Sequence, residues 1–112
     1  MTDKSQNISK NIALITDYME KNHTNDIKLS DIANLLGYDY HYVSRYFYSV
    51  FNMSFSEFLI LYRLETAINL MEKTDKKILE IALESGFQSV RSFNDCFKAH
   101  FKMSPTEYKK KR

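Results

Sequence analysis

The sequence has little glycine, proline and cysteine. Its 112 residues include two glycines, one proline and one cysteine, Cys96. An all-β fold needs many turns with positive φ, which glycine adopts most readily, so two glycines are too few for such a fold. A single cysteine excludes an intramolecular disulfide framework and a cysteine-rich zinc site. It also suits a reducing compartment, and we therefore expect the protein to be cytoplasmic.

The sequence also lacks the patterns of membrane proteins, secreted proteins and enzymes. Its longest apolar run is far shorter than the roughly 20 residues that span a membrane. The first residues do not show a basic segment followed by an apolar one, so we expect no secretory signal. It contains no Ser-His-Asp order, paired-acid site, glycine-rich phosphate loop or metal-binding motif. We therefore expect no enzymatic activity, no catalytic residue, no cofactor, no metal and no membrane association.

Charge is nearly balanced in number but uneven along the chain. The formal net charge is +2, from 16 basic and 14 acidic residues. Residues 57–112 carry 11 of the basic residues and end in a basic run over 109–112. This excess is compatible with a polyanionic partner such as nucleic acid. A solvated helical tail explains it equally well.

Apolar residues recur at helical spacing, and no segment alternates with the period of a strand. Asp39 is a suitable N-cap, and Ser54 and Ser104 each precede a glutamate three residues later, which is the spacing of a capping box. Pro105, directly after Ser104, strengthens the last of these helix starts. The sequence thus predicts an all-α fold of seven helices, covering about residues 8–22, 29–36, 40–51, 55–72, 76–85, 89–101 and a last helix from 105.

The chain contains an internal repeat. At an offset of 49 residues, Ile32-Ala33 matches Ile81-Ala82, and Gly37 matches Gly86. Beyond the glycine, one extra residue makes the offset 50, and the two Ser-x-x-Glu helix starts then correspond. The inward-facing residues of the later helix correspond as well, Val43, Phe47 and Phe51 matching Phe93, Phe97 and Phe101. Helices alike by chance would share the apolar spacing but not also the glycines and the caps.

Each copy consists of a short helix, a glycine turn and a second helix, the order of a helix-turn-helix. The small Ala33 or Ala82 suits a close helix crossing, and the residue after the turn, Tyr38 or Phe87, is expected to cover the small core. Any compact helical hairpin has a similar pattern, but two copies joined by one long helix favour DNA binding. We predict a flexible N-terminus, residues 1–7; a first helix-turn-helix subdomain, 8–53; a long linker helix, 54–72; and a second helix-turn-helix subdomain, 73–112.

The second copy resembles a known family. From Ile81 to Tyr108, the pattern Ile-Ala … Gly-Phe … Phe … Phe-Lys … Phe … Ser-Pro … Tyr is similar to the signature of the DNA-binding domain of AraC/XylS bacterial transcription regulators. Residues 53–58, followed by Arg63, also resemble the linker helix of that family. The similarity extends over about residues 8–111. It implies seven helices in two subdomains, and a monomeric domain that binds duplex DNA at two adjacent major-groove segments.

Helical geometry predicts which side chains face outward on the third and sixth helices. Val43 and Phe47 point inward on the third, and Phe93 and Phe97 point inward on the sixth, so the opposite faces are open to a ligand. The resemblance implies that family members make their base contacts from these same faces. We therefore expect DNA contacts from Tyr40, His41, Ser44, Arg45, Tyr48, Ser89, Val90, Arg91, Asn94, Asp95, Lys98 and Lys102.

The donors and acceptors of these side chains suggest separate roles. Arg45 or Arg91 can hold guanine through two parallel hydrogen bonds, and Asn94 can hold adenine in the same way. Lys98 and Lys102 are better suited to phosphates.

Asp95 departs from the family, in which a basic residue is common at this place. Two roles are open for its carboxylate. It can pair with Arg91 four residues earlier and orient that side chain, or it can accept a hydrogen bond from a cytosine amino group. Next to these polar residues, Val90 suits a thymine methyl group.

Together these patterns predict sequence-specific binding of double-stranded DNA for transcription regulation, in the cytoplasm at the nucleoid. RNA polymerase is a further candidate partner. A complete small regulator and a piece of a longer one with an effector-sensing or receiver domain both fit the sequence. The alternative function is a helical protein–protein interaction module with lost or weak DNA binding, which Asp95 and the low net charge of +2 favour.

Overall fold

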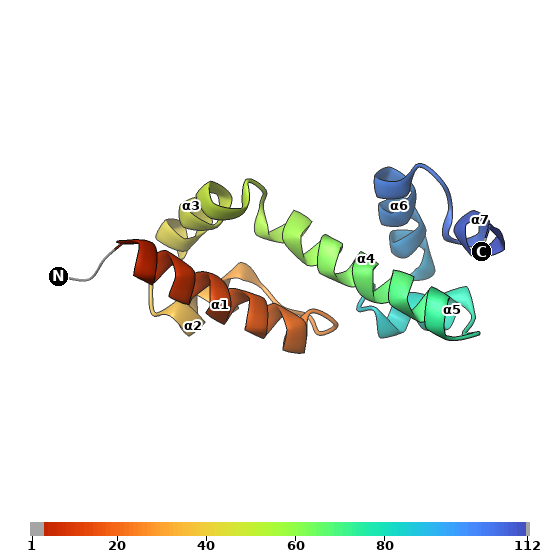
Figure 1. The fold of residues 1–112 in the computed structure, drawn as a ribbon, viewed down its shortest axis with the longest axis horizontal. Coiled ribbons are helices and arrows are strands. Elements are labelled where there is room, and N and C mark those ends of the chain that lie inside the picture. The colour runs from red at the N-terminus through yellow and green to blue at the C-terminus, as the bar shows by residue number, and fades with distance from the viewer. Residues whose placement is uncertain (1–3, 112) are drawn as a thin grey trace. The chain divides into compact units, whose positions relative to one another are not determined.

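The computed structural model describes the backbone of residues 4–111 and the side chains of residues 9–111. These residues form seven α-helices and no strand, which confirms the predicted all-α class (Figure 1). The helices are α1 (Lys4–Asn22), α2 (Leu29–Leu36), α3 (Tyr40–Phe51), α4 (Phe55–Lys73), α5 (Ile78–Glu84), α6 (Val90–Phe101) and α7 (Pro105–Lys110). Within the described part of the chain, no helix is long and apolar enough to cross a membrane.

The chain folds as two compact units. Unit 1 comprises Met1–Leu59, with α1, α2, α3 and the start of α4, and unit 2 comprises Ile60–Arg112, with the rest of α4 and α5 to α7. α4 is a single continuous helix that crosses the boundary between the units. The finer division made from the sequence, with a separate terminus and a separate linker helix, stays a prediction.

The core of unit 1 is formed by the inward faces of its first three helices. The most deeply buried side chains of these helices are Ile15, Met19, Ile32, Ala33, Val43 and Phe47. The centroid of the Phe47 ring lies 4.6 Å from that of Phe51 and 5.1 Å from that of Phe58. Burying one such ring contributes about 2–3 kcal/mol. This packing fixes the Phe47 face of α3 inward, and the opposite face of the helix is therefore turned outward.

The two glycine turns have the geometry that a helix-turn-helix requires. Gly37 ends α2 with a φ of 76°, and Gly86 has a φ of 102° at the corresponding place after α5. In both copies the residue after the glycine donates its backbone N–H to an alanine carbonyl, Ala33 at 3.1 Å and Ala82 at 3.0 Å. Glycine favours this turn because a side chain with a Cβ is strained at positive φ.

Side-chain caps fix where α3 and α6 begin. Asp39 caps α3, and its Oδ2 accepts a hydrogen bond from the backbone N–H of His41 at 2.9 Å. Ser89 caps α6, and its Oγ accepts from the backbone N–H of Ser92 at 3.1 Å. Each cap satisfies a backbone donor that the helix itself leaves without a partner.

Both Ser-x-x-Glu helix starts form as predicted, and the second is a complete capping box. Ser104 Oγ accepts from the Glu107 N–H at 3.1 Å, while Glu107 Oε1 accepts from the Ser104 N–H at 3.2 Å. At the start of α4, Ser54 Oγ accepts from the Glu57 N–H at 3.2 Å and donates to Glu57 Oε1 at 3.4 Å. Equivalent residues therefore begin α4, which follows α3, and α7, which follows α6.

The core of unit 2 is centred on Phe93 and Phe97 of α6, which are both fully buried. The other buried members of this core are Leu64, Ala67, Met71, Ile81, Ala82 and Phe87. Three helices, α4, α5 and α6, thus contribute to one cluster, and they hold α6 with one face inward.

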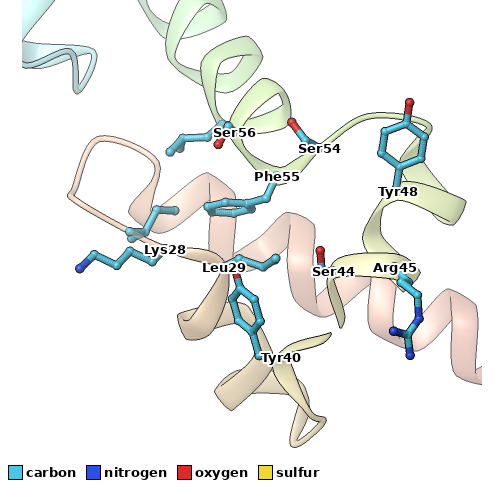
Figure 2. A pocket seen from close by; sticks show the side chains of 11 residues that line it. Lys28, Leu29, Tyr40, Ser44, Arg45, Tyr48, Ser54, Phe55 and Ser56 are labelled. Atoms are coloured by element: carbon cyan, nitrogen blue, oxygen red, sulfur yellow. The ribbon is translucent and has the colours of Figure 1, made fainter. Parts of the chain in front are cut away.

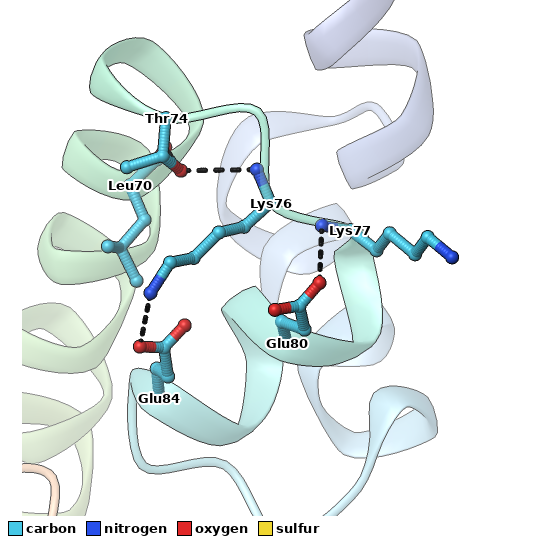
Figure 3. Close-up of polar contacts among 6 residues, drawn as sticks. All are labelled: Leu70, Thr74, Lys76, Lys77, Glu80 and Glu84. Atoms are coloured by element: carbon cyan, nitrogen blue, oxygen red, sulfur yellow. Dashed lines mark hydrogen bonds and ion pairs between the residues drawn. The ribbon is translucent and has the colours of Figure 1, made fainter.

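Polar contacts tie the α4–α5 connection to its surroundings. Lys76 Nζ pairs with Glu84 Oε1 at 2.6 Å, and Lys77 N–H donates to Glu80 Oε1 at 3.3 Å (Figure 3). The carbonyl of Lys76 also accepts a hydrogen bond from Lys109 Nζ of α7 at 2.7 Å. Lys109 is therefore part of the fold of unit 2 and not part of a solvated tail.

Two helix starts differ from those expected. α1 begins at Lys4, four residues before the expected start, while residues 1–3 of the predicted flexible terminus and the side chain of Ile8 lie outside what the structure describes. α5 begins at Ile78, two residues later than expected, because Lys77 has the extended backbone of an N-cap.

Two aromatic residues expected in the core are more exposed than predicted. Phe101 is 40% exposed because it is the last residue of α6, although the centroid of its ring lies 4.6 Å from that of the Phe97 ring. Tyr38 is 42% exposed, whereas its counterpart Phe87 is 5% exposed. The phenol of Tyr38 keeps access to water and rests edge-on against Tyr42 at 5.3 Å.

Candidate nucleic-acid interface

The outward face of α3 forms the first half of the candidate interface. α3 buries Val43 and Phe47, so side chains about half a turn away point to solvent. The five residues predicted on this face are all exposed: Tyr40, His41, Ser44, Arg45 and Tyr48. Figure 2 shows four of them, with Tyr40 near the start of the helix and Tyr48 near its end.

A hollow of about 610 Å³ lies beside this face, wholly within unit 1. Its walls come from residues 27–29 at the start of α2, from α3, and from residues 54–59 at the start of α4 (Figure 2). Leu29 and Phe55 give the walls apolar surface, while Lys28 and Arg45 supply positive charge. This combination suits a sugar-phosphate backbone, which alternates apolar sugars with anionic phosphates.

The sequence reasoning missed the wall residues outside α3. Lys28, Leu29 and Phe55 lie in segments far from each other in sequence, and only folding brings them together around α3. The available signal was that residues 29 and 55 were both predicted helix starts, where backbone N–H groups are left without helical partners.

The sequence reasoning also missed a row of three tyrosines, Tyr38, Tyr42 and Tyr46, on another side of α3. The Tyr42 and Tyr46 rings stack with centroids 6.0 Å apart, and Tyr38 packs edge-on against Tyr42. Tyr42, Arg45, Tyr46 and Ser49 border a second hollow of about 320 Å³. The Tyr46 hydroxyl is buried and has no hydrogen-bond partner among the described residues. The i, i+4 spacing of these residues was the signal in the sequence.

The outward face of α6 forms the second half of the candidate interface. Its exposed residues, as predicted, are Arg91, Asn94, Asp95, Lys98 and Lys102. Ser89 uses its hydroxyl to cap the helix, and Val90 is partly buried against the core of unit 2, so both have less to offer a base than expected. Lys102 ends α6 with a φ of 60°, and its Nζ donates to the Ala99 carbonyl at 3.1 Å.

One of the two roles expected for Asp95 is not realised. No ion pair joins Arg91 to Asp95 in the described chain. In a helix, an acid four residues before a base pairs better than the reverse order. Asp17 and Lys21 have the favourable order and pair at 3.1 Å. Because the order at Arg91 and Asp95 is reversed, the exposed Asp95 carboxylate stays open to a ligand.

Two groups in unit 2 have shifted pKa values. Burial raises the pKa of the Cys96 thiol and the Asp95 carboxylate raises it further, while Arg63 acts in the opposite sense. Burial and the Asp95 carboxylate both favour the neutral thiol form of Cys96. The Ser104 backbone N–H and hydroxyl lower the pKa of Glu107, which keeps the α7 cap ionised. Among residues 9–111, no group of three or more His, Cys, Asp or Glu side chains could hold a metal ion.

Comparison with known sequences identifies similar proteins. Residues 32–111 match a family model described as a helix-turn-helix domain. The Transposon Tn10 TetD protein of Escherichia coli is 35% identical over 95 residues, which are 85% of this chain and 69% of TetD. An uncharacterised HTH-type transcriptional regulator of Staphylococcus aureus is 32% identical over 95 residues, and this chain spans only 13% of its length.

Solved structures with the same fold include two informative cases. A transcriptional regulator from Chromobacterium violaceum, described as AraC-type, superposes with a TM-score of 0.83 and 26% identity, over 93% of each chain. The DNA-binding domain of AdpA, solved in complex with a target DNA, superposes with a TM-score of 0.80 and 22% identity, over 88% of each chain. At this identity, the second comparison shows a shared fold.

Proposed function

We propose that this chain, a member of the AraC family of helix-turn-helix regulators, binds two successive major-groove segments of DNA, one with α3 and one with α6. Regulators of this family bind DNA sequence-specifically to regulate transcription. The observation that carries this proposal is the agreement between the two copies of the motif. In each copy, the positions opposite the buried Val43–Phe47 or Phe93–Phe97 pair hold exposed polar side chains. A duplicated exposed face, supported on two separate cores, supports two separate contacts with DNA.

The side chains of these faces support a division of roles. Arg45 and Arg91 present planar donors that match guanine, and Asn94 matches adenine. Lys98 and Lys102 fit phosphates, which fix the position of a protein on the duplex without reading sequence. The hollow of unit 1 supports a further backbone contact in the half read by α3, through Lys28 and the apolar Leu29.

The wider setting of the domain is also a proposal. A single chain carries both motifs that a bipartite site requires, which supports action as a monomer. We place the domain in the cytoplasm at the nucleoid, where its DNA target lies. RNA polymerase is the proposed second partner, and the exposed Leu79 and Leu83 of α5 offer an apolar surface for a protein of this kind.

Selection of bound sequences from a random duplex library tests the proposed function. We expect two short conserved blocks with centres about ten base pairs apart, which is one turn of B-DNA. Sedimentation of the protein with a selected duplex should give one chain per site. A single conserved block, or two chains per site, would contradict the proposal that one chain binds both blocks.

A protein–protein interaction module is the second candidate function. The exposed Tyr38–Tyr42 pair favours it, because aromatic side chains are enriched in protein interfaces. Gel shifts across a salt series separate the two functions. DNA binding should weaken steeply as salt rises, since phosphate contacts release counterions. No binding to any duplex, even at low salt, would favour the interaction module.

A further inference from the structure

Asp95 occupies the most outward position of α6. At about 100° per residue, it lies about 180° around the helix from the midpoint between the buried Phe93 and Phe97. Its side chain is exposed, and it forms no ion pair with Arg91. A helix that enters a groove with its buried face held by the core brings this position deepest, so the chemistry of Asp95 meets the base edges first.

The other motif provides a comparison within the same molecule. Arg45 lies about 180° around α3 from the midpoint between Val43 and Phe47, and it is the counterpart of Asp95 in the repeat. The deepest-reaching position is therefore cationic on one recognition helix and anionic on the other. Both side chains are exposed, so burial in a core dictates neither the cation nor the anion.

We propose that Asp95 is a specificity-determining residue that selects cytosine, through a hydrogen bond from the cytosine N4 amino group to its carboxylate, in the segment that α6 reads. This proposal rests on the proposed function. Arg91 and Lys98, one turn before and nearly one turn after Asp95 on the same face, keep the surroundings of the carboxylate positive, so that α6 can still approach a polyanion.

The base edges of the major groove explain the choice of cytosine. Only cytosine N4 and adenine N6 present amino donors there, while guanine and thymine present acceptors that repel a carboxylate. Adenine N6 has the acceptor N7 beside it, which also repels a carboxylate, whereas cytosine has no such acceptor next to N4. A carboxylate that meets no donor loses its hydration without compensation. Asp95 therefore rejects wrong bases as well as accepting the right one.

The test combines sequence selection with three variants. Arg91→Ala first identifies the block read by α6. In the wild-type protein, we expect one position of that block to prefer cytosine by roughly tenfold. With Asp95→Ala, the four bases should be bound almost equally at this position, and the base preferences at the other positions should stay unchanged. Asp95→Arg should replace the cytosine preference with a guanine preference, as at its counterpart Arg45.

The matched control is Glu20→Gln, an exposed carboxylate of α1. It changes the net charge by the same amount as Asp95→Ala and should leave every base preference unchanged. Thermal melts should show that Asp95→Ala and Glu20→Gln both fold, because both side chains are exposed and alanine favours a helix.

Three outcomes would overturn the inference, and they are distinguishable from one another. The carboxylate does not read a base if the Asp95→Ala variant keeps the cytosine preference. The same conclusion follows if Asp95→Ala raises the affinity for every duplex equally, by the factor that Glu20→Gln also gives. If the wild-type protein selects a block for α3 but none for α6, Asp95 does not enter the groove. If the wild-type protein selects no duplex at all, the proposed function itself is wrong.

Discussion

Arg45 and Arg91 are exposed arginines on the outward faces of two recognition helices, one in each unit. Since the guanidinium presents its donors in a rigid plane, each is the side chain of its helix best suited to bind guanine. We expect Arg45→Ala to relax base preference in one block of the binding site and Arg91→Ala in the other, each at a cost of about 1–3 kcal/mol. Sequence selection with each variant measures this effect.

Lys10→Ala serves as the control for the arginine variants, because Lys10 is an exposed cation of α1 outside both recognition helices. It should leave both blocks intact. Relaxation of the same block by both arginine variants would show that the two helices do not read separate segments.

The sequence predicted the direction of most side chains in the site but not what they contact. Helical periodicity fixes where a Cβ points, and it correctly gave the exposure of Arg45, Asn94 and Lys98. Periodicity does not show that the Ser89 hydroxyl is used as a cap or that Val90 packs on a core. Those properties depend on neighbours that only the folded chain provides.

At the scale of elements, the turn after α2 gives a test of stability. A Cβ added at Gly37 meets no atom within 4 Å, so the effect of Gly37→Ala comes from the backbone alone. We expect a loss of about 1–2 kcal/mol in the free energy of unfolding, because alanine is strained at a φ of 76°. Urea denaturation measures the loss. Gly37→Asn should lose less, since asparagine tolerates this conformation better, and an equal loss in both variants would point to another cause.

The capping box of α7 predicts a dependence of stability on pH. In the folded protein, the pKa of Glu107 is below its ordinary value of 4.5. The ionised carboxylate therefore stabilises the fold above pH 4.5, and this stabilisation is lost as the pH falls through the lowered pKa of the folded state. Glu107→Gln should therefore melt below the wild-type protein at neutral pH, and the difference should narrow in acid. Thermal melts across this range measure it.

Ser104→Ala provides the companion to the Glu107 experiment. It removes the hydroxyl that accepts from the Glu107 N–H. The Ser104 hydroxyl helps to lower the pKa of Glu107, and this effect is lost with the hydroxyl. The stability of the Ser104→Ala variant should therefore depend less on pH than that of the wild-type protein. A difference between wild-type protein and Glu107→Gln that stays constant with pH would show that ionisation of Glu107 does not stabilise the cap.

The sequence predicted the elements well because their boundaries are coded locally. Asp39 caps α3, Gly37 ends α2 and Ser104 begins α7, each through contacts within a few residues. The hollow of unit 1 has no such local code. It forms where Leu29 and Phe55, from separate helix starts, meet the side of α3, and a single sequence does not show that meeting.

At the scale of the whole molecule, the salt dependence of DNA binding reports the number of phosphate contacts. If Lys98 contacts one phosphate, Lys98→Ala should reduce the slope of the logarithm of affinity against the logarithm of salt concentration by about 0.9. Gel shifts on a selected duplex measure both slopes, and Lys10→Ala is again the control. An unchanged slope in Lys98→Ala would remove this residue from the phosphate contacts.

The overall architecture was predictable because the chain repeats itself. The match of Gly37 with Gly86 and of Ser54 with Ser104 identifies two copies of one motif in the sequence alone. The repeat did not predict how the copies differ: Tyr38 remains in contact with water, whereas Phe87 is buried. Such differences arise because each copy packs against its own neighbours.

Opposite charges at Arg45 and Asp95 also have a consequence for orientation. Two identical subunits related by a two-fold axis read a palindrome and sit on it the same way in either direction. If a single chain binds through two unlike helices, as proposed, the complex has no such symmetry, and the two ends of the target differ. Inverting the target relative to a promoter would turn the bound protein around, and would present the opposite flank to whatever binds downstream.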